Sequence, residues 1–401
     1  MSNPADSQKF RRTSLTLGGM NLWKLSFRPF FLFGALFSLL ATSLWMAVLF
    51  GLLPYHGSLV PVVWHSHEMV YGFSTAIIAG FVLTAVQNWS GRPGIRGLHL
   101  QLLFAVWLLP RILLAVYPLP TLLVSGVDLL FFPLLGSSLV PYLRDPELKT
   151  ERVFIAYFGV FFIGNLLVHL DAHDFLSGYA GSGIRLGLHS VILIIIFMGG
   201  RVIPFFTESS IAKSQPKTFS SIEILSHTSA WFFLFSMFFA PVSNWTAGVA
   251  LFAGLIHSIR LSGWYVRRIR RVAILWILHV AYLWIVVGFI LSALASLEVL
   301  PLTLATHAFT VGAVGSIIYG MITRVSLGHT GRPLKPSVLI MAGYLILSLS
   351  AVVRVFGPML SPRLYAGSLA VAGGLWMLAF LFFIFEYTPI LTAARIDGRD
   401  G

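Results

Sequence analysis

The stretch WHSHEMVYG, residues 64 to 72, places two histidines and a glutamate close together at the start of a long apolar segment. Imidazole nitrogens ligate haem iron, copper and zinc, and a nearby carboxylate commonly accepts a hydrogen bond from the other ring nitrogen of a ligand histidine. In a helix, His65 and His67 would lie about 200° apart, so a single centre would use only one of them. We expect His67 to face that centre, Glu68 to orient a ligand histidine, and His65 to serve a second site.

A second copy of this stretch begins at His307, 240 residues later. Without a gap, these residues of the first copy are identical in the second: His67, Gly72, Ile77, Ile78, Gly80, Gly91, Arg92 and Pro93 align with His307, Gly312, Ile317, Ile318, Gly320, Gly331, Arg332 and Pro333. An ionisable group is costly to bury, so its recurrence at one position of two apolar segments favours ligand or proton chemistry. Two neutral histidines from facing helices can occupy both axial positions of haem iron, and we predict that His67 and His307 bind haem b in this way.

The chain contains no cysteine, which narrows the metal chemistry that it can support. Disulfides, iron–sulfur clusters, thiolate metal sites and covalently attached c-type haem are excluded. Copper accepts imidazole and thioether ligands. His189 with His65, His169 or His173 could therefore form a copper site without cysteine.

The composition predicts which elements position these residues. Hydrophobic residues make up 57% of the 401 residues and charged residues 10%. Apolar segments of about twenty residues recur along the chain, without the alternation of a transmembrane barrel, and each can cross a bilayer as a helix. We predict an all-α polytopic membrane protein, with a cytoplasmic N-terminal segment (1–29), a transmembrane domain (30–386) and a cytoplasmic C-terminal tail (387–401). Its twelve helices are expected near 30–50, 67–87, 99–117, 120–143, 152–170, 183–203, 221–241, 243–263, 272–296, 303–323, 337–356 and 364–385.

The distribution of positive charge predicts the orientation in the membrane. With the N-terminus inside, only Arg111, Arg185, Arg354 and Arg363 of the 27 lysines and arginines fall in outer segments. The excess of Lys and Arg in the inner loops predicts that both termini are cytoplasmic. The net charge of +13 is explained by these loops, so nucleic-acid binding is not predicted.

The distance between the two copies indicates an internal repeat of four helices. The offset carries helix 2 onto helix 10, which skips eight helices, and helix 6 also begins with a histidine, His189. Its inner end reads GGRVIP, where Pro204 is expected to end the helix. We hypothesise three tandem four-helix units, which would place His67, His189 and His307 at one depth near the outer face.

The other polar residues of the apolar segments are Asp128, Asn165 and Arg201. Asp128 is expected to pair with an outer-side arginine such as Arg111, or to take part in proton movement. Arg201 is expected to pair with Glu208. Ionisable residues inside a membrane are functional candidates by default, because an unpaired charge there is costly.

These motifs together resemble one known family. WHSHEMVYGF with AGFVLTAVQNWSGRP, then GGRVIPFFT and MITRVSLGHTGRPL, resemble the NnrS family along essentially the whole chain, from about Arg28 to helix 12. The resemblance implies a bacterial inner-membrane protein with twelve helices that contains haem and copper. It also implies a role in nitric oxide metabolism and nitrosative stress.

The order of the histidines is also similar to that in the catalytic subunit of haem–copper oxidases and nitric oxide reductases. Those subunits have twelve helices in three four-helix arcs and metal ligands on helices 2, 6, 7 and 10, where this chain has His67, His189, His227 and His307. His227 is expected near the inner face, however, and helix 10 has one histidine where the oxidases have a pair. The similarity therefore does not imply a complete binuclear centre.

Two functions remain open at this point. The first is a haem- and copper-binding membrane protein that binds, senses or turns over nitric oxide or an iron–nitrosyl species; as an enzyme it would be a haem–copper type nitric oxide oxidoreductase. The alternative is a multi-helix transporter with a histidine-lined site, since repeated helix units around a central site are common in transporters. A transporter predicts polar residues near the middle of the membrane, whereas the predicted ligand histidines lie near the outer face.

Overall fold

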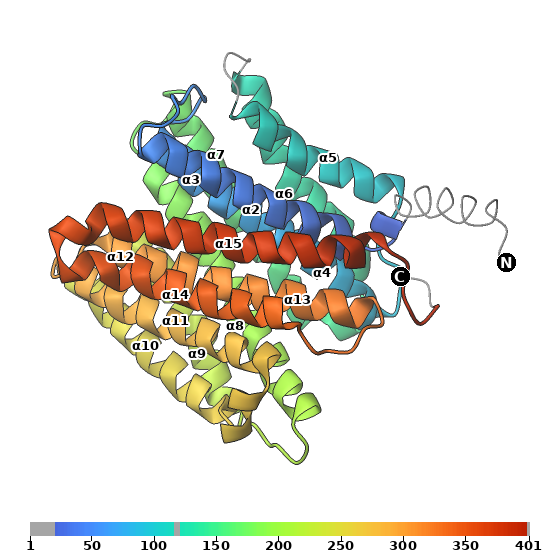
Figure 1. The fold of residues 1–401 in the computed structure, drawn as a ribbon. Helices are drawn as coiled ribbons and strands as arrows, with labels where there is room; N and C mark the ends of the chain where they lie inside the picture. The colour runs from blue at the N-terminus through green and yellow to red at the C-terminus, as the bar shows by residue number, and fades with distance from the viewer. Residues whose placement is uncertain (1–20, 116–120, 399–401) are drawn as a thin grey trace, which may run out of the picture.

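The computed structural model describes residues 21–115 and 121–398, which form a bundle of long helices and contain no strand (Figure 1). The α-helices are α2 (Phe27–Leu49), α3 (Pro61–His67), α4 (Thr75–Ser90), α5 (Leu98–Leu113), α6 (Thr121–Leu143), α7 (Val153–Ala172), α8 (Ala180–Ser210), α9 (Ser220–Phe239), α10 (Asn244–Trp264), α11 (Ala273–Ser296), α12 (Leu302–His307), α13 (Ser316–His329), α14 (Val338–Leu360) and α15 (Tyr365–Thr392). The π-helical segments are η1 (Glu68–Ser74) and η5 (Ala308–Gly315), and short 3-10 turns are η2 (Pro146–Leu148), η3 (Thr150–Arg152), η4 (Arg267–Arg271) and η6 (Pro362–Leu364).

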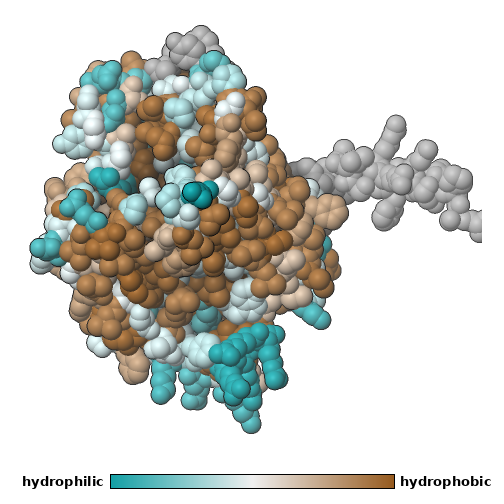
Figure 2. All heavy atoms as spheres, turned by 60° about the vertical axis from the view of Figure 1, so that its left-hand side comes forward, coloured by the Kyte–Doolittle hydropathy of each residue, from teal (hydrophilic) through white to brown (hydrophobic). Residues whose placement is uncertain are grey.

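These helices confirm the predicted class, a polytopic all-α membrane protein. Within the described residues, eleven helical segments are long and apolar enough to cross a membrane, and α5 is a shorter apolar helix between two of them. Much of the face drawn in Figure 2 is apolar, and hydrophilic side chains gather at its lower edge. The start of α2 and the end of α15 lie at the same end of the bundle (Figure 1). The arrangement agrees with an even number of crossings.

The predictions for the inner end of the sixth predicted helix, which is α8, were wrong in two respects. Helix α8 continues through Pro204 to Ser210, because a membrane helix tolerates proline where neighbouring groups take over the lost hydrogen bond. Arg201 pairs with Glu151, on η3 just before α7, and not with Glu208. Because α8 is still helical at Glu208, this residue lies about two helical turns beyond Arg201 and not beside it.

The packing of the helices repeats through three four-helix units. Helices α2 to α6 form the first unit, α7 to α10 the second and α11 to α15 the third. In each unit the first helix packs against the second and the third against the fourth. The fourth helix of each unit also packs against the first of the next, as α6 against α7, α10 against α11 and α15 against α2. The units thus form a closed ring, with α8 in the interior contacting both η1 and η5.

The helix made of α3, η1 and α4 and the helix made of α12, η5 and α13 share an irregularity that supports the sequence repeat. Each is an α-helix interrupted by a π-helical segment, and each segment begins one residue after the repeated histidine, at Glu68 and at Ala308. Helix α8 is α-helical throughout and lacks this feature. Single π-turns occur frequently at functional sites, because the wider turn re-aims side chains.

Candidate metal centre

Six buried polar side chains from four neighbouring helices form one cluster, which we call the ionic network. Two of the residues lie at the junction of α3 and η1. Helices α5 and α6 contribute one each, and α7 contributes two that are separated by one helical turn. None is more than 3% exposed. The six are His67, Glu68, Arg111, Asp128, Asn165 and His169.

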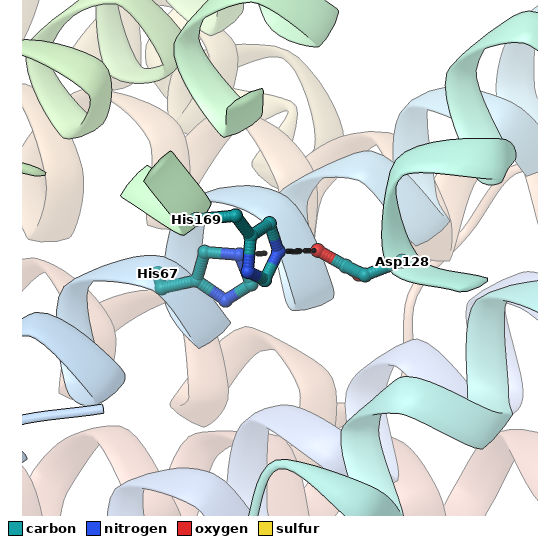
Figure 3. A group of neighbouring side chains, drawn as sticks. All are labelled: His67, Asp128 and His169. Carbon is teal, nitrogen blue, oxygen red and sulfur yellow. Dashed lines mark hydrogen bonds and ion pairs between the residues drawn. The ribbon is translucent and has the colours of Figure 1, made fainter. Parts of the chain in front are cut away.

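Asp128 is the centre of the ionic network. Its Oδ2 lies 3.2 Å from Nε2 of His67 and 2.9 Å from Nε2 of His169, and it accepts a hydrogen bond of 2.8 Å from Nδ2 of Asn165. Its Oδ1 pairs with the guanidinium of Arg111, which confirms the predicted ion pair. Figure 3 shows His67 and His169 both pointing toward the Asp128 carboxylate.

Glu68 occupies the other side of His67. Its Oε1 lies 3.0 Å from Nδ1 of His67, so it can accept a hydrogen bond from that ring. Its Oε2 lies 3.2 Å from Nη1 of Arg111, so one arginine faces both carboxylates of the network. Nε2 of His67 is also 2.8 Å from Oδ1 of Asn165. Both ring nitrogens of His67 therefore have oxygen partners.

The π-turn η1 is tied to α5 by a hydrogen bond to one of its carbonyl groups. The indole Nε1 of Trp107 on α5 donates a hydrogen bond of 2.9 Å to the carbonyl of Gly72. A Cβ at Gly72 would lie 2.7 Å from Phe37 and 2.8 Å from Oε2 of Glu68, so only glycine fits there. The small residue serves close packing here, in agreement with the usual role of such stripes in membrane helices.

The ionic network has the composition and spacing of a metal site. One nitrogen from His67, one from His169 and one oxygen from Asp128 lie within 4.8 Å of one another, and no other such group occurs in the described part of the chain. Ligand atoms about 2.1 Å from a metal are separated by about 3.0 Å at an angle of about 90° and by about 3.4 Å at the tetrahedral angle. The two nitrogen–oxygen distances, 3.2 and 2.9 Å, are close to these values. Two imidazoles and a carboxylate are a ligand set for iron, copper or zinc.

The charges of the ionic network also leave room for a cation. It contains two carboxylates, one guanidinium and two imidazoles, so one negative charge is uncompensated when the histidines are neutral. An uncompensated charge is costly in a buried site. A bound metal ion or an additional proton would remove it.

Comparison with known proteins places the chain in a family. A model of the NnrS protein family matches residues 21–395. The chain belongs to the NnrS family. The match covers nearly all of the sequence and confirms the resemblance stated above. A search of curated proteins found no match.

In this NnrS protein, two other predicted ligands are held in the form that binds metals. Nδ1 of His189 lies 2.7 Å from the carbonyl of Arg185, and Nδ1 of His307 lies 2.7 Å from the carbonyl of Thr303. A carbonyl oxygen only accepts hydrogen bonds, so each Nδ1 carries the proton and each Nε2 presents its lone pair. Neither histidine belongs to the ionic network; His189 instead packs edge-on against Phe309.

The remaining predicted ligands divide between the network and the region of His307. His173 ends α7, and its Nε2 lies 2.9 Å from the hydroxyl of Ser125, one turn before Asp128. His65 stacks on Trp45 with ring centroids 4.5 Å apart. His65 and His307 interact electrostatically with each other, and both interact with Arg354.

No hydrogen bond or ring contact joins His67 to His307 within the residues that the structure describes; His67 contacts His169 and Tyr71. Haem ligation by the pair His67 and His307 stays a prediction.

A second buried ionic group lies between α8, α9, α10 and α11, and sequence reasoning missed it. Arg260 pairs with Glu223 and donates a hydrogen bond of 2.7 Å to the hydroxyl of Tyr282, whose oxygen is also 2.7 Å from Nδ1 of His257. A Cβ at Gly200 would lie 2.0 Å from Nη2 of Arg260. Gly200 of the GGR motif is therefore explained by the space that this ion pair requires against α8. This glycine is a clue to the group in the sequence.

Proposed function

We propose that this NnrS family member is a metal-binding membrane protein of the nitric oxide response, with a copper ion held by His67, Asp128 and His169. The buried two-imidazole, one-carboxylate group carries this proposal. Copper is the ion that the family resemblance implies, imidazole is among its ligands, and a monovalent cation would balance the network when both histidines are neutral. Nitric oxide is small and apolar, so it can reach a buried centre through the lipid.

In this proposal the surrounding residues hold the ligands and exclude water. Glu68 fixes the ring of His67 through Nδ1, and Arg111 holds the free oxygen of Asp128 and that of Glu68. Such partners of metal ligands commonly change metal affinity by 10- to 100-fold when they are removed. A bound copper ion would supply a binding position for nitric oxide and exchange single electrons with it. Binding, sensing and turnover of nitric oxide or an iron–nitrosyl species are all compatible with this arrangement.

For haem b, we propose His307 and His65 as the axial pair in place of His307 and His67. His307 presents a free Nε2, whereas both nitrogens of His67 face oxygen atoms in the ionic network. His65 and Arg354 are within electrostatic range of His307, and Arg354 has no acidic partner among the described residues. An arginine next to two imidazoles fits a cofactor that has both a metal and carboxylate groups.

The test is a metal analysis and an absorption spectrum of the detergent-purified protein and of single variants. His169→Ala and Asp128→Asn should lose copper and keep the haem spectrum, whereas His307→Ala and His65→Ala should change the haem spectrum and keep copper. His56→Ala, in an exposed loop, is the matched control and should change neither. Copper retained in both network variants would overturn the assignment of the metal site.

The location proposed for this protein is the bacterial inner membrane, with both termini in the cytoplasm. The network and His307 would then lie toward the periplasmic side. The transporter alternative is supported by the buried charges at contacts between repeated helices. Uptake of a solute by reconstituted vesicles, abolished by Asp128→Asn in protein that contains no metal, would favour the transporter.

A further inference from the structure

A cavity of about 410 Å³ lies between the three central helices α4, α8 and α13, far from the ionic network. Thr84, at its wall, is seventeen residues beyond His67, or about 25 Å along the helix. The cavity is therefore near the other end of the membrane-spanning segment, which the charge distribution assigns to the cytoplasmic side. Nothing in the proposed metal chemistry uses it.

One arginine lines this cavity and a second lies behind its wall. Arg201 and His329 line it together with the neutral Asn88 and Thr84, and no acidic residue lines it. Arg201 pairs with Glu151 through one nitrogen. Arg324 lies over the ring of the lining residue Phe206, with its guanidinium carbon 3.7 Å from the ring centroid, and its buried Nη1 has no hydrogen-bond partner among the described residues. No acidic residue pairs with Arg324 in the described part of the chain, and its formal charge outweighs the roughly half-charge at the carboxyl end of a helix, so the cavity favours an anion.

The other walls are apolar and reach the surface of the bundle. Phe81, Trp89, Phe205 and Met198 line the cavity. The side chain of Phe205 is 62% exposed and that of Arg201 is 38% exposed, so both also face the outside of the bundle. A site that joins a cationic pocket to an exposed aromatic surface fits a ligand with an anionic head and an apolar chain.

We propose that this cavity binds the phosphate headgroup of an anionic phospholipid, with the start of an acyl chain along Phe205. Basic pockets between membrane helices on the cytoplasmic side are typical sites for such headgroups. A soluble phosphate would use the same cations but not the apolar surface. The two sources can therefore be distinguished by experiment.

The experiment measures thermal stability and native mass spectra of the full-length, delipidated protein in detergent. Phosphatidylglycerol should bind and raise the unfolding temperature, while phosphatidylcholine and inorganic phosphate should not. An equal effect of phosphatidylcholine, or of inorganic phosphate alone, would overturn the proposal.

Three variants test the place of binding. Ala85→Phe fills the cavity without changing the charge and should abolish the effect of phosphatidylglycerol. Glu151→Gln releases Arg201 from its partner and should strengthen binding about fivefold, the equivalent of about 1 kcal/mol for one cation near a phosphate. Arg267→Gln, an exposed arginine of η4, is the control and should leave binding unchanged. Loss of binding in Arg267→Gln equal to that in Ala85→Phe, or weaker binding in Glu151→Gln, would show surface attraction instead of a site.

Discussion

The helices α3–η1–α4 and α12–η5–α13 have the same irregular backbone around a repeated histidine, yet the residues around that histidine differ between them. His67 is fully buried and has oxygen partners at both ring nitrogens, whereas His307 is half-buried and its Nδ1 bonds to a carbonyl of its own helix. At the same offset of 240 residues, Glu68 corresponds to Ala308 and Arg111 to Ala351. The third charged neighbour of His67, Asp128, corresponds to Ser368. A repeated backbone therefore does not carry its chemistry with it.

The difference shows what the π-turn contributes. In both copies it follows a histidine and contains a glycine that lies against an aromatic ring, Phe37 for Gly72 and Trp284 for Gly312. Only in α3–η1–α4 does the histidine beside the π-turn lie opposite charged residues of three further helices. The ionic network depends on these residues and not on the turn alone.

The largest effect is expected for Arg111→Ala, which gives the first copy the residue found in the second. It leaves the carboxylates of Glu68 and Asp128 without their cation in a buried site, and the free energy of unfolding should fall by about 3–5 kcal/mol. Thermal or denaturant unfolding in detergent measures this change. Arg363→Ala, at an exposed position, should change stability by less than about 0.5 kcal/mol. Equal stabilities for the two variants would mean that the network is not a buried ion-pair system.

The repeated histidines should respond unequally to the same substitution. His67→Gln removes a partner from Glu68 and from Asp128, so unfolding free energy should decrease by about 1–3 kcal/mol. His307→Gln should cost less than about 1 kcal/mol, because its only hydrogen bond among the described residues is to a carbonyl of its own helix. Equal losses in parallel unfolding experiments would contradict the contrast between the two copies.

The repeated glycines should respond alike in stability and differently in metal content. Gly72→Ala and Gly312→Ala each place a Cβ within 3 Å of an aromatic ring and should destabilise the protein by about 1–3 kcal/mol. Gly72→Ala also crowds Glu68, so it alone should lower the copper content measured on purified protein. Loss of copper in Gly312→Ala would place the metal elsewhere.

The smallest effect is expected at the edge of the ionic network. Ser125→Ala removes the hydroxyl that lies 2.9 Å from Nε2 of His173, at a cost of about 0.5–1.5 kcal/mol. Copper content should be unchanged, because His169 keeps its contact with Asp128. A variant without copper would add His173 to the metal ligands and bring the original set of predicted copper histidines closer to the network.

The sequence by itself determined the membrane class, the twelve helices, the repeat of four and the pairing of Asp128 with Arg111. These follow from the length of apolar segments and from the cost of leaving a charge unpaired in a membrane, which are properties of the chain and its solvent. The sequence did not determine which histidines meet. His67 lies on α3, His169 on α7 and Asp128 on α6. Their convergence depends on the order of helices around the ring and on the π-turn at Glu68. Only the tertiary structure decides this, because the rotation of each helix about its axis is set by packing against neighbours distant in the chain.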